Sequence, residues 1–118
     1  MKRRDGDGIE GTIRRGMRRG TLTIDRRLDL HGFTQSAAHS ALARFLSRAA
    51  SDGVRLVLVI TGKGGSGAET LNRLVPLWLR EGDLRARVSM VRPAAAEHGG
   101  AGAYYVYLAR STRARSAD

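Results

Sequence analysis

The stretch that decides the fold is VRLVLVITGKGGSG at residues 54–67. Its first seven residues are almost all β-branched or leucine, and four of its last six residues are glycine. This length and composition, ended by glycines, predict a buried β-strand rather than a short helix. Helical spacing resumes after the glycines, so the local order is strand, glycine loop, helix.

The glycine loop is a candidate anion-binding site. Glycines at the carboxyl end of a buried strand allow backbone N–H groups to converge on an anion, and Lys63 lies among them. Of the 21 basic residues in the chain, only Lys2 and Lys63 are lysines. A lysine amid such an arginine bias indicates a position that needs a compact ammonium on a flexible stem. The alternative is a tight turn with a solvated lysine.

The composition limits the kind of protein. A chain of 118 residues forms one domain and can bury a core without staples. It has no cysteine, which excludes disulfides and thiolate metal sites and suits a reducing compartment. No apolar stretch approaches the roughly 18 residues that span a bilayer, and the amino terminus lacks a hydrophobic signal region. We therefore expect a cytoplasmic protein without a membrane partner.

The formal net charge of +10 makes a polyanion the first partner to consider. Residues 1–27 hold nine basic and four acidic side chains, a net of +5, and residues 110–118 hold three arginines against one aspartate. Both ends are predicted to grip phosphates without reading bases, unless they are merely solvated tails. We expect a basic, partly disordered arm at 1–20, one domain at 21–110, a basic tail at 111–118, and a monomer in the absence of nucleic acid. Ile13 and Met17 are four residues apart, which allows a short helix or a docked segment at about 12–19 within the arm.

The other elements follow from periodicity. Alternation predicts strands at 24–30, 86–92 and 103–109, and three- and four-residue spacing predicts a helix of about 35–51 with Thr34 as its N-cap. A second amphipathic helix follows the glycine loop. Pro76 lies inside it, so we expect this helix either to be kinked there or to start only a turn earlier.

The order β-α-β-α-β-β predicts an α/β fold, a two-layer sandwich with a mixed sheet of about four strands and two helices on one face. The other face is then open or covered by the N-terminal arm. Tyr105 and Tyr107 are expected on that face. They either stack on bases of a single strand or form an ordinary half-buried pleated surface.

Asp29 and His31 form the best catalytic pair. They are two residues apart in an extended segment, so both project to the same face, opposite Leu28 and Leu30. A carboxylate beside an imidazole orients the ring and stabilises its charged form, which is the arrangement of a general acid or base. The alternative is structural: the aspartate caps the turn at Gly32 and the histidine is a surface residue.

Other titratable and aromatic groups give weaker signals. Asp25, Asp29, Glu97, His31 and His98 show no recognised metal spacing, so no metal residues are assigned and a divalent cofactor stays open. DNA hydrolysis commonly uses a metal to generate the nucleophile, whereas RNA carries its own 2′-OH. His98 begins a second glycine loop with Gly99 and Gly100, which the predicted topology allows to approach the first loop at one sheet edge. This second loop either helps to hold a phosphate or is a simple turn. His39 and Trp78 are expected to be structural.

Three motifs together resemble one family. These are LDLHG at 28–32, TGKG at 61–64, and HGGAGA at 98–103 followed by Tyr105 and Val106. They resemble the signatures of the Smr (small MutS-related) domain over roughly residues 18–110, in a form that stands alone in bacteria. The segment PLWL at 76–79 is similar to the family's second helix.

The resemblance implies a fold similar to the C-terminal domain of a bacterial translation initiation factor. It also implies nucleic-acid binding and, in many members, endonuclease activity, either nicking of DNA or cleavage of RNA, including messages on stalled ribosomes. It assigns Asp29 and His31 to the active site and Thr61, Gly62, Lys63 and Gly64 to substrate binding.

Two other functions are weighed against this one. The loop matches G-x-G-x-x-G between a strand and a helix, as in dinucleotide-binding enzymes, but Glu81 and Asp83 precede the next strand instead of ending it. The other alternative is a module that binds nucleic acid or the ribosome with the same loops and performs no chemistry.

Overall fold

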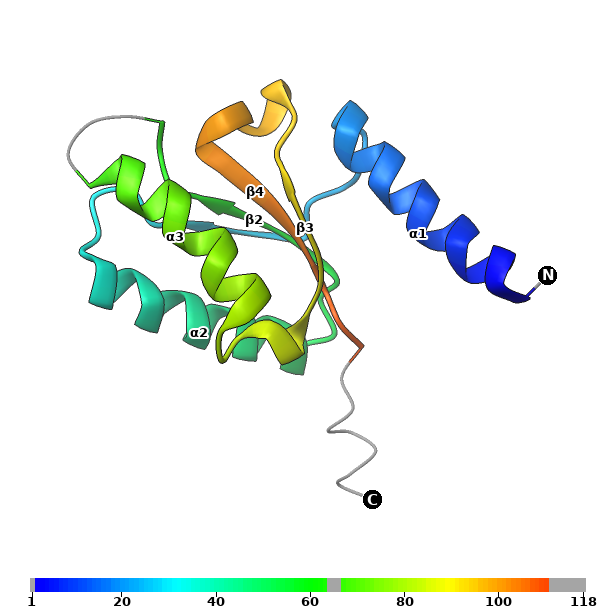
Figure 1. The fold of residues 1–118 in the computed structure, drawn as a ribbon, viewed down its shortest axis with the longest axis horizontal. Coiled ribbons are helices and arrows are strands. Elements are labelled where there is room, and N and C mark those ends of the chain that lie inside the picture. The colour runs from blue at the N-terminus through cyan, green and yellow to red at the C-terminus, as the bar shows by residue number, and fades with distance from the viewer. Residues whose placement is uncertain (1, 64–66, 111–118) are drawn as a thin grey trace, which may run out of the picture.

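The computed structural model describes residues 2–63 and 67–110. Within these ranges a four-stranded sheet lies between α1 on one face and two helices on the other (Figure 1). The helices are α1 (Lys2–Arg19), α2 (Gln35–Ser51) and α3 (Ala68–Glu81); the strands are β1 (Arg26–Asp29), β2 (Leu56–Ile60), β3 (Val88–Pro93) and β4 (Ala103–Leu108). Short 3-10 turns lie at Arg85–Arg87, Ala96–His98 and Gly100–Gly102.

The sheet has the strand order β1-β2-β4-β3. β1 pairs with β2 in parallel, and β4 pairs antiparallel with both β2 and β3. The predicted mixed α/β sheet is confirmed. A single parallel pair is not the parallel βαβαβ half of a dinucleotide-binding fold, so that alternative is excluded. The topology also places the carboxyl ends of β1, β2 and β3 and the amino end of β4 at one end of the sheet.

α2 spans the residues that the sequence predicted. The hydroxyl of Thr34 accepts a hydrogen bond from the backbone N–H of Ala37 at 3.2 Å, which confirms the expected N-cap. The buried stripe consists of Ala38, Leu42, Leu46 and Ala49. These side chains pack on Val57 and Val59 of β2 and on Leu30. Because Leu30 directly follows β1, this packing holds the start of the β1–α2 turn in place.

α3 continues through Pro76, so the expectation that it starts only a turn earlier is wrong. Proline has no N–H to donate to the carbonyl four residues before it, which is that of Asn72. The structure supplies another donor, because the hydroxyl of Tyr104 donates to the Asn72 carbonyl at 2.9 Å. This bond compensates the helix and fastens it to β4.

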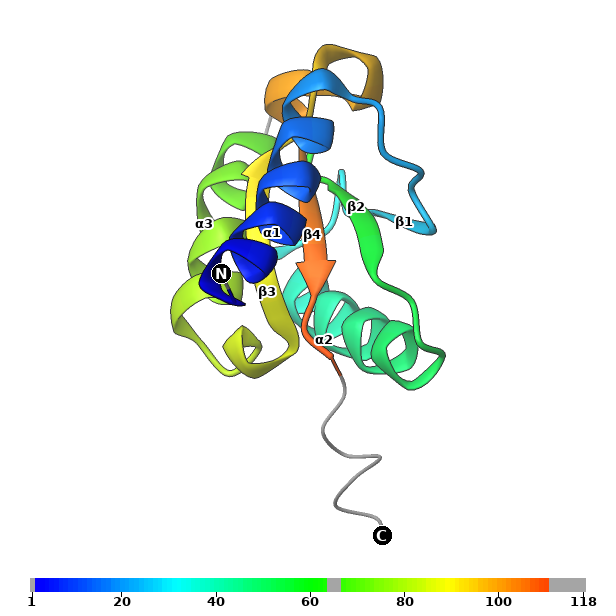
Figure 2. The same cartoon turned by 90° about the vertical axis from the view of Figure 1, so that its right-hand side faces the viewer.

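The second face of the sheet is covered by α1, one of the two arrangements that the sequence predicted (Figure 2). Ile13 and Met17 of α1 pack against the even-numbered residues of β2 and against Tyr105, which is only 1% exposed. Tyr105 therefore belongs to the pleated core and not to a stacking surface. Tyr107 is half-buried, with the guanidinium of Arg55 4.8 Å from its ring centroid.

The two predicted arms differ in what the structure describes. The sequence indicated a short helix or docked segment near 12–19 inside a partly disordered arm, and the observed helix covers Lys2–Arg19. The predicted tail at 111–118 lies outside the described residues. None of the helices in the described ranges combines the length and the apolarity needed to cross a bilayer.

Candidate active site

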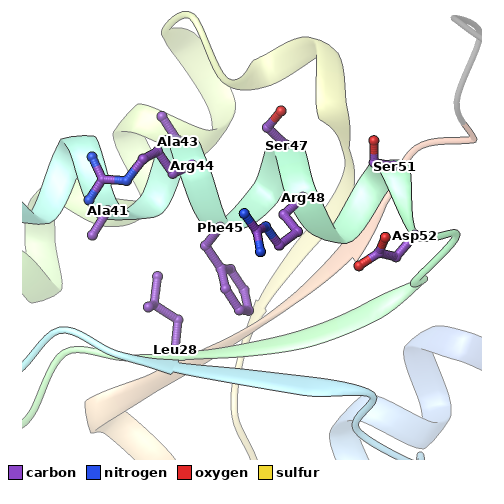
Figure 3. Close-up of a pocket in the computed structure, with 9 residues that line it drawn as sticks. All are labelled: Leu28, Ala41, Ala43, Arg44, Phe45, Ser47, Arg48, Ser51 and Asp52. Atoms are coloured by element: carbon purple, nitrogen blue, oxygen red, sulfur yellow. The ribbon is translucent and has the colours of Figure 1, made fainter.

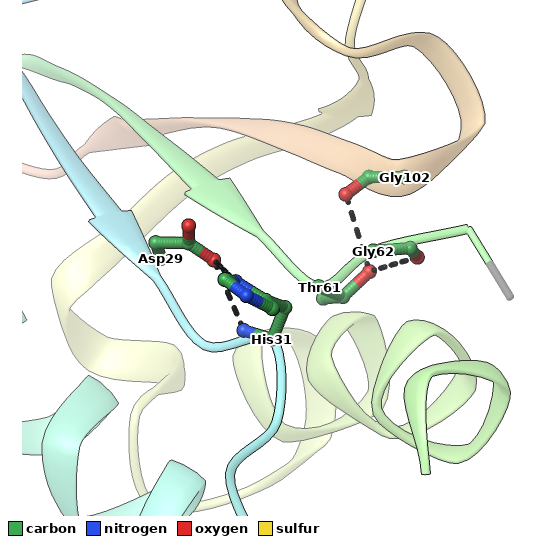
Figure 4. A network of polar contacts seen from close by, with 5 residues as sticks. All are labelled: Asp29, His31, Thr61, Gly62 and Gly102. Atoms are coloured by element: carbon green, nitrogen blue, oxygen red, sulfur yellow. Dashed lines mark hydrogen bonds and ion pairs between the residues drawn. The ribbon is translucent and has the colours of Figure 1, made fainter. Parts of the chain in front are cut away.

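The candidate site begins where β1 ends. Asp29 is the last residue of β1, and His31 follows it in the turn toward α2. The ring nitrogen Nδ1 of His31 donates to Oδ1 of Asp29 at 2.7 Å, and the backbone N–H of His31 donates to the same oxygen at 3.0 Å (Figure 4). The predicted same-face placement is confirmed. The side chains of His31 and Asp29 are 71% and 49% exposed, so a solvent-borne substrate can reach them.

The hydrogen bonds define the chemistry of the pair. The ring N–H of His31, followed by its backbone N–H, holds the pKa of the Asp29 carboxyl below its ordinary value of 3.8, so this group stays ionised near neutrality. With Nδ1 carrying the proton that Asp29 accepts, Nε2 of the neutral ring has a free lone pair. The bond to Asp29 thus fixes the orientation of the His31 ring, which is the arrangement of a general acid or base.

The first glycine loop lies next to this pair. Thr61 is fully buried at the end of β2, and its hydroxyl donates toward the carbonyls of Gly62 and Gly102 (Figure 4). Its side chain is therefore engaged inside the protein and positions the loop. Gly62 has φ +91°, a conformation that favours glycine, and Lys63 beyond it is exposed. Gly64 lies outside the described residues.

The second glycine loop contacts the first, as the topology predicted. The backbone N–H groups of Thr61 and Gly62 both donate to the carbonyl of Gly102, at 2.9 and 3.1 Å. A Cβ on Gly102 would lie 2.8 Å from Cγ of Lys63 and 3.0 Å from the carbonyl carbon of Gly62. Only glycine allows this approach, so the two loops form one surface.

His98 takes a position different from that of His31. Its Nδ1 is hydrogen-bonded to the hydroxyl of Tyr105 at 2.6 Å, and the two rings meet edge to face. The same hydroxyl accepts the backbone N–H of Ala95 at 3.3 Å. His98 thereby ties the second loop to the sheet. Gly99 and Gly100 next to it both have positive φ, at 117° and 54°, and form the turn that leads to Gly102.

Asn72 is a site residue that sequence reasoning missed. Its side-chain amide donates to the Thr61 hydroxyl at 3.0 Å and to the Ala101 carbonyl at 2.7 Å, so it joins both loops from α3. The available signal was Pro76, four residues later, which frees the Asn72 carbonyl and requires a tertiary partner near this point.

Other predicted features fall away from the site. His39 packs edge to face on Trp78 at 4.9 Å, which confirms both as structural. Among residues 2–63 and 67–110, no three histidine, aspartate or glutamate side chains gather as metal ligands. An open groove lies between α2 and the outer edge of β1 (Figure 3). It includes Leu28, which faces the opposite side of the sheet from Asp29, so this groove is separate from the candidate site.

Fold and site together define an α/β domain in which an Asp–His pair and two joined glycine loops share one end of a mixed sheet that has helices on both faces. The family model of the Smr domain matches residues 28–109, which covers all three motifs and most of the chain. The chain belongs to the Smr domain family.

Solved structures of two relatives are similar. The stand-alone small MutS-related protein YdaL from Escherichia coli is 33% identical, with a TM-score of 0.68 over 81% of this chain and 72% of that one. The Smr domain of Thermus thermophilus MutS2 is 25% identical, with a TM-score of 0.60 over 71% of this chain and 98% of that one.

Relatives known by name carry two kinds of description. A ribosome rescue factor, SmrB of Haemophilus influenzae, is 30% identical over 102 residues, 86% of this chain and 58% of that protein. A probable DNA endonuclease, SmrA of Escherichia coli, is 30% identical over 112 residues, 92% of this chain and 58% of that protein. The chain spans just over half the length of these two relatives.

Proposed function

We propose that this protein is a cytoplasmic, nucleic-acid-binding endonuclease that cleaves phosphodiester bonds at the Asp29–His31 pair. The observation that carries the proposal is the 2.7 Å bond from His31 Nδ1 to an exposed, ionised carboxylate, which leaves Nε2 outside that bond on a side chain that is 71% exposed. A monomer is the working state. The names of the relatives point to DNA and to the ribosome, and the Smr resemblance adds RNA, including messages on stalled ribosomes, as a candidate substrate.

With RNA as the substrate, the Asp29–His31 pair can supply the proton acceptor that attack by the 2′-OH requires. Nε2 of His31 accepts the proton of a 2′-OH while the 2′-oxygen attacks phosphorus and the bond to the 5′-oxygen breaks. The products are a cyclic phosphate and a 5′-hydroxyl, which takes its proton from the imidazolium or from water. Asp29 holds the ring and stabilises its positive charge; it is a positioning residue.

The loops are proposed to hold the phosphate during this step. Lys63 is exposed after the end of β2 and supplies a compact positive charge, and Gly62 permits close approach of its backbone. Gly64, outside the described residues, is included as the Smr resemblance implies. Thr61 acts by fixing the loop from beneath. The second loop contributes His98, Gly99 and Gly100 to the proposed phosphate site. It contacts the first loop closely through Gly102, so the two loops form the surface on which the phosphate would bind.

The test is cleavage of matched RNA and DNA single strands by wild type and His31→Ala, each with and without EDTA. We expect wild-type cleavage to fall by a factor of about 10²–10⁴ in His31→Ala with binding retained. RNA cleavage that survives EDTA and yields a cyclic phosphate supports the mechanism above. Cleavage of DNA only with added divalent metal would assign generation of the nucleophile to that metal.

A module that binds nucleic acid or the ribosome without cutting is the second candidate. It is favoured by the name of the SmrB relatives and by the net charge of +10. Wild-type protein that binds both oligonucleotides and cuts neither would establish it in place of the endonuclease.

A further inference from the structure

A second basic surface lies at the edge of the sheet farthest from β1. Arg14 and Arg18 of α1 and Arg92 of β3 line a cavity of about 460 Å³ where α1 crosses the sheet. Its remaining lining is uncharged: Met17, Pro93, Ala94 and Ala95. Figure 2 shows α1 in front of β3 and β4, so the docked helix is what forms one wall of the cavity.

The three guanidinium groups have little internal compensation. Arg14 has one ion pair, a long contact of 3.9 Å to Glu10, and its Nε is buried without a partner. Arg18 and Arg92 are exposed and form no ion pair in the described part of the chain. Guanidinium groups present planar donors that match phosphate oxygens, so an anion is the ligand that such a cavity selects.

The basic surface continues around β3. Arg92 also lines a neighbouring hollow on the outer edge of β3, together with Arg80 and Arg85. Arg80 donates to the carbonyl of Val91 at 3.2 Å, which places its charge against the edge strand. The two hollows together hold five arginines: Arg14 and Arg18 on α1, Arg80 on α3, Arg85 in the turn before β3, and Arg92 on β3. A single phosphate needs fewer, so this surface suits a chain of phosphates.

The position of the cavity relates it to the candidate active site. β3 runs in the same direction as β1 and β2, so its end at Pro93 lies at the same end of the sheet as Asp29 and His31. The strand order puts three strand spacings between β1 and β3, a separation of about 14 Å. At a rise of about 3.4 Å per stacked nucleotide, this separation corresponds to about four nucleotides.

We infer that the cavity of Arg14, Arg18 and Arg92 is a second phosphate-binding site, which holds the sugar–phosphate backbone of a nucleic-acid strand about four nucleotides from the bond at His31. The inference rests on the proposed function for its substrate class. It adds that α1 is part of the nucleic-acid interface and that the protein grips strands that extend from the cleavage end of the sheet to its far edge.

The test compares two double variants that remove equal charge. In Arg18→Ala/Arg92→Ala both exposed arginines leave the cavity. The control is Arg44→Ala/Arg48→Ala in the groove of α2, where both side chains are also exposed and lack an ion pair in the described ranges (Figure 3). The probes are labelled 20-nucleotide oligouridine and oligothymidine, and the readout is the dissociation constant over a series of salt concentrations.

We expect the cavity variant to bind about tenfold more weakly near 0.1 M salt, and its salt slope to fall by about 1.4, or 0.7 for each lost contact to single-stranded phosphate. The control is expected to change affinity less than about twofold. An equal loss in both variants, or none in the cavity variant, overturns the inference and leaves the proposed cleavage intact. If the wild-type protein cuts neither oligonucleotide and the cavity variant still binds more weakly than wild type, the inference is supported and the proposed cleavage is rejected.

Discussion

Two histidines of this protein use the same ring atom for opposite purposes. Nδ1 of His31 is bonded to an exposed carboxylate, and Nδ1 of His98 is bonded to the hydroxyl of a buried tyrosine. The bond lengths are nearly equal, 2.7 and 2.6 Å. The partner and its surroundings distinguish them: Asp29 can stabilise an imidazolium in contact with solvent, whereas Tyr105 is 1% exposed and anchors a loop.

The comparison shows why neighbouring glycines do not define a catalytic histidine. Both residues are in glycine-containing motifs at the same end of the sheet, and the sequence made His31 a catalytic candidate and His98 a phosphate-binding candidate. A charged partner that leaves the second ring nitrogen outside the bond fits the proposed proton transfer, while a neutral buried partner provides rigidity. The first pair should therefore respond in rate and the second in stability.

The largest expected effect is the crossed pattern of the two alanine variants. His31→Ala should lower cleavage by about 10²–10⁴-fold, because it removes the proton acceptor, and should leave the melting temperature nearly unchanged. His98→Ala should lower stability by about 1 kcal/mol through loss of the tyrosine bond, with a much smaller effect on cleavage. Rate assays and thermal melts on both variants measure this, and an equal rate loss in His98→Ala would erase the distinction.

The next effect concerns the contact between the two glycine loops, of which the second carries His98. Gly102→Ala places a methyl group 3.0 Å from the backbone of Gly62 and 2.8 Å from the Lys63 side chain, so the loops must separate. We expect a loss of about 1–3 kcal/mol in a denaturant titration. Gly11→Ala in α1 is the control, because its Cβ makes only an ordinary contact at 3.4 Å and a helical alanine is favourable. A neutral Gly102→Ala would show that the approach is not tight in solution.

Much of this arrangement could be predicted from local pattern. The limits of α2, the mixed sheet and the shared face of Asp29 and His31 follow from periodicity and caps, which depend on neighbouring residues alone. The meeting of the two glycine loops followed from strand direction.

What sequence could not provide depends on tertiary partners. The mixture of charges and glycines in residues 1–20 gives only one weak helix signal, the four-residue spacing of Ile13 and Met17, and the packing of these two side chains becomes visible only against the sheet. An alternating tyrosine strand does not reveal which face will be covered, so the burial of Tyr105 stayed one of two alternatives. Pro76 indicates only that the Asn72 carbonyl lacks its helical donor, and nothing in the sequence shows that the Asn72 side chain donates to a carbonyl 29 residues away.

A smaller effect isolates the anchoring bond of the second histidine. Tyr105→Phe keeps the buried ring and removes the hydroxyl that bonds His98 and accepts the N–H of Ala95. We expect a loss of about 1 kcal/mol, or a melting temperature about 4 °C lower. Tyr107→Phe is the matched control, since its ring contact with Arg55 does not use the hydroxyl. Equal melting temperatures of the two variants would mean that the His98 bond contributes nothing.

The smallest effect is the titration of Asp29, which tests the first pair directly. Two hydrogen bonds from His31, that of the ring first and that of the backbone second, hold the carboxyl pKa below 3.8. A lowered pKa means that the native state binds fewer protons than the unfolded state, so the stabilisation is present above pH 3.8 and is lost as the pH falls through the native pKa. The contribution is small because the carboxylate is half exposed.

Following the Asp29 carboxyl carbon by NMR over about pH 2–6 should give a midpoint below that of an ordinary aspartate. In His31→Ala the midpoint should rise only part of the way, since the backbone N–H at residue 31 remains; a wild-type midpoint at the ordinary value would remove the physical basis for assigning proton transfer to His31.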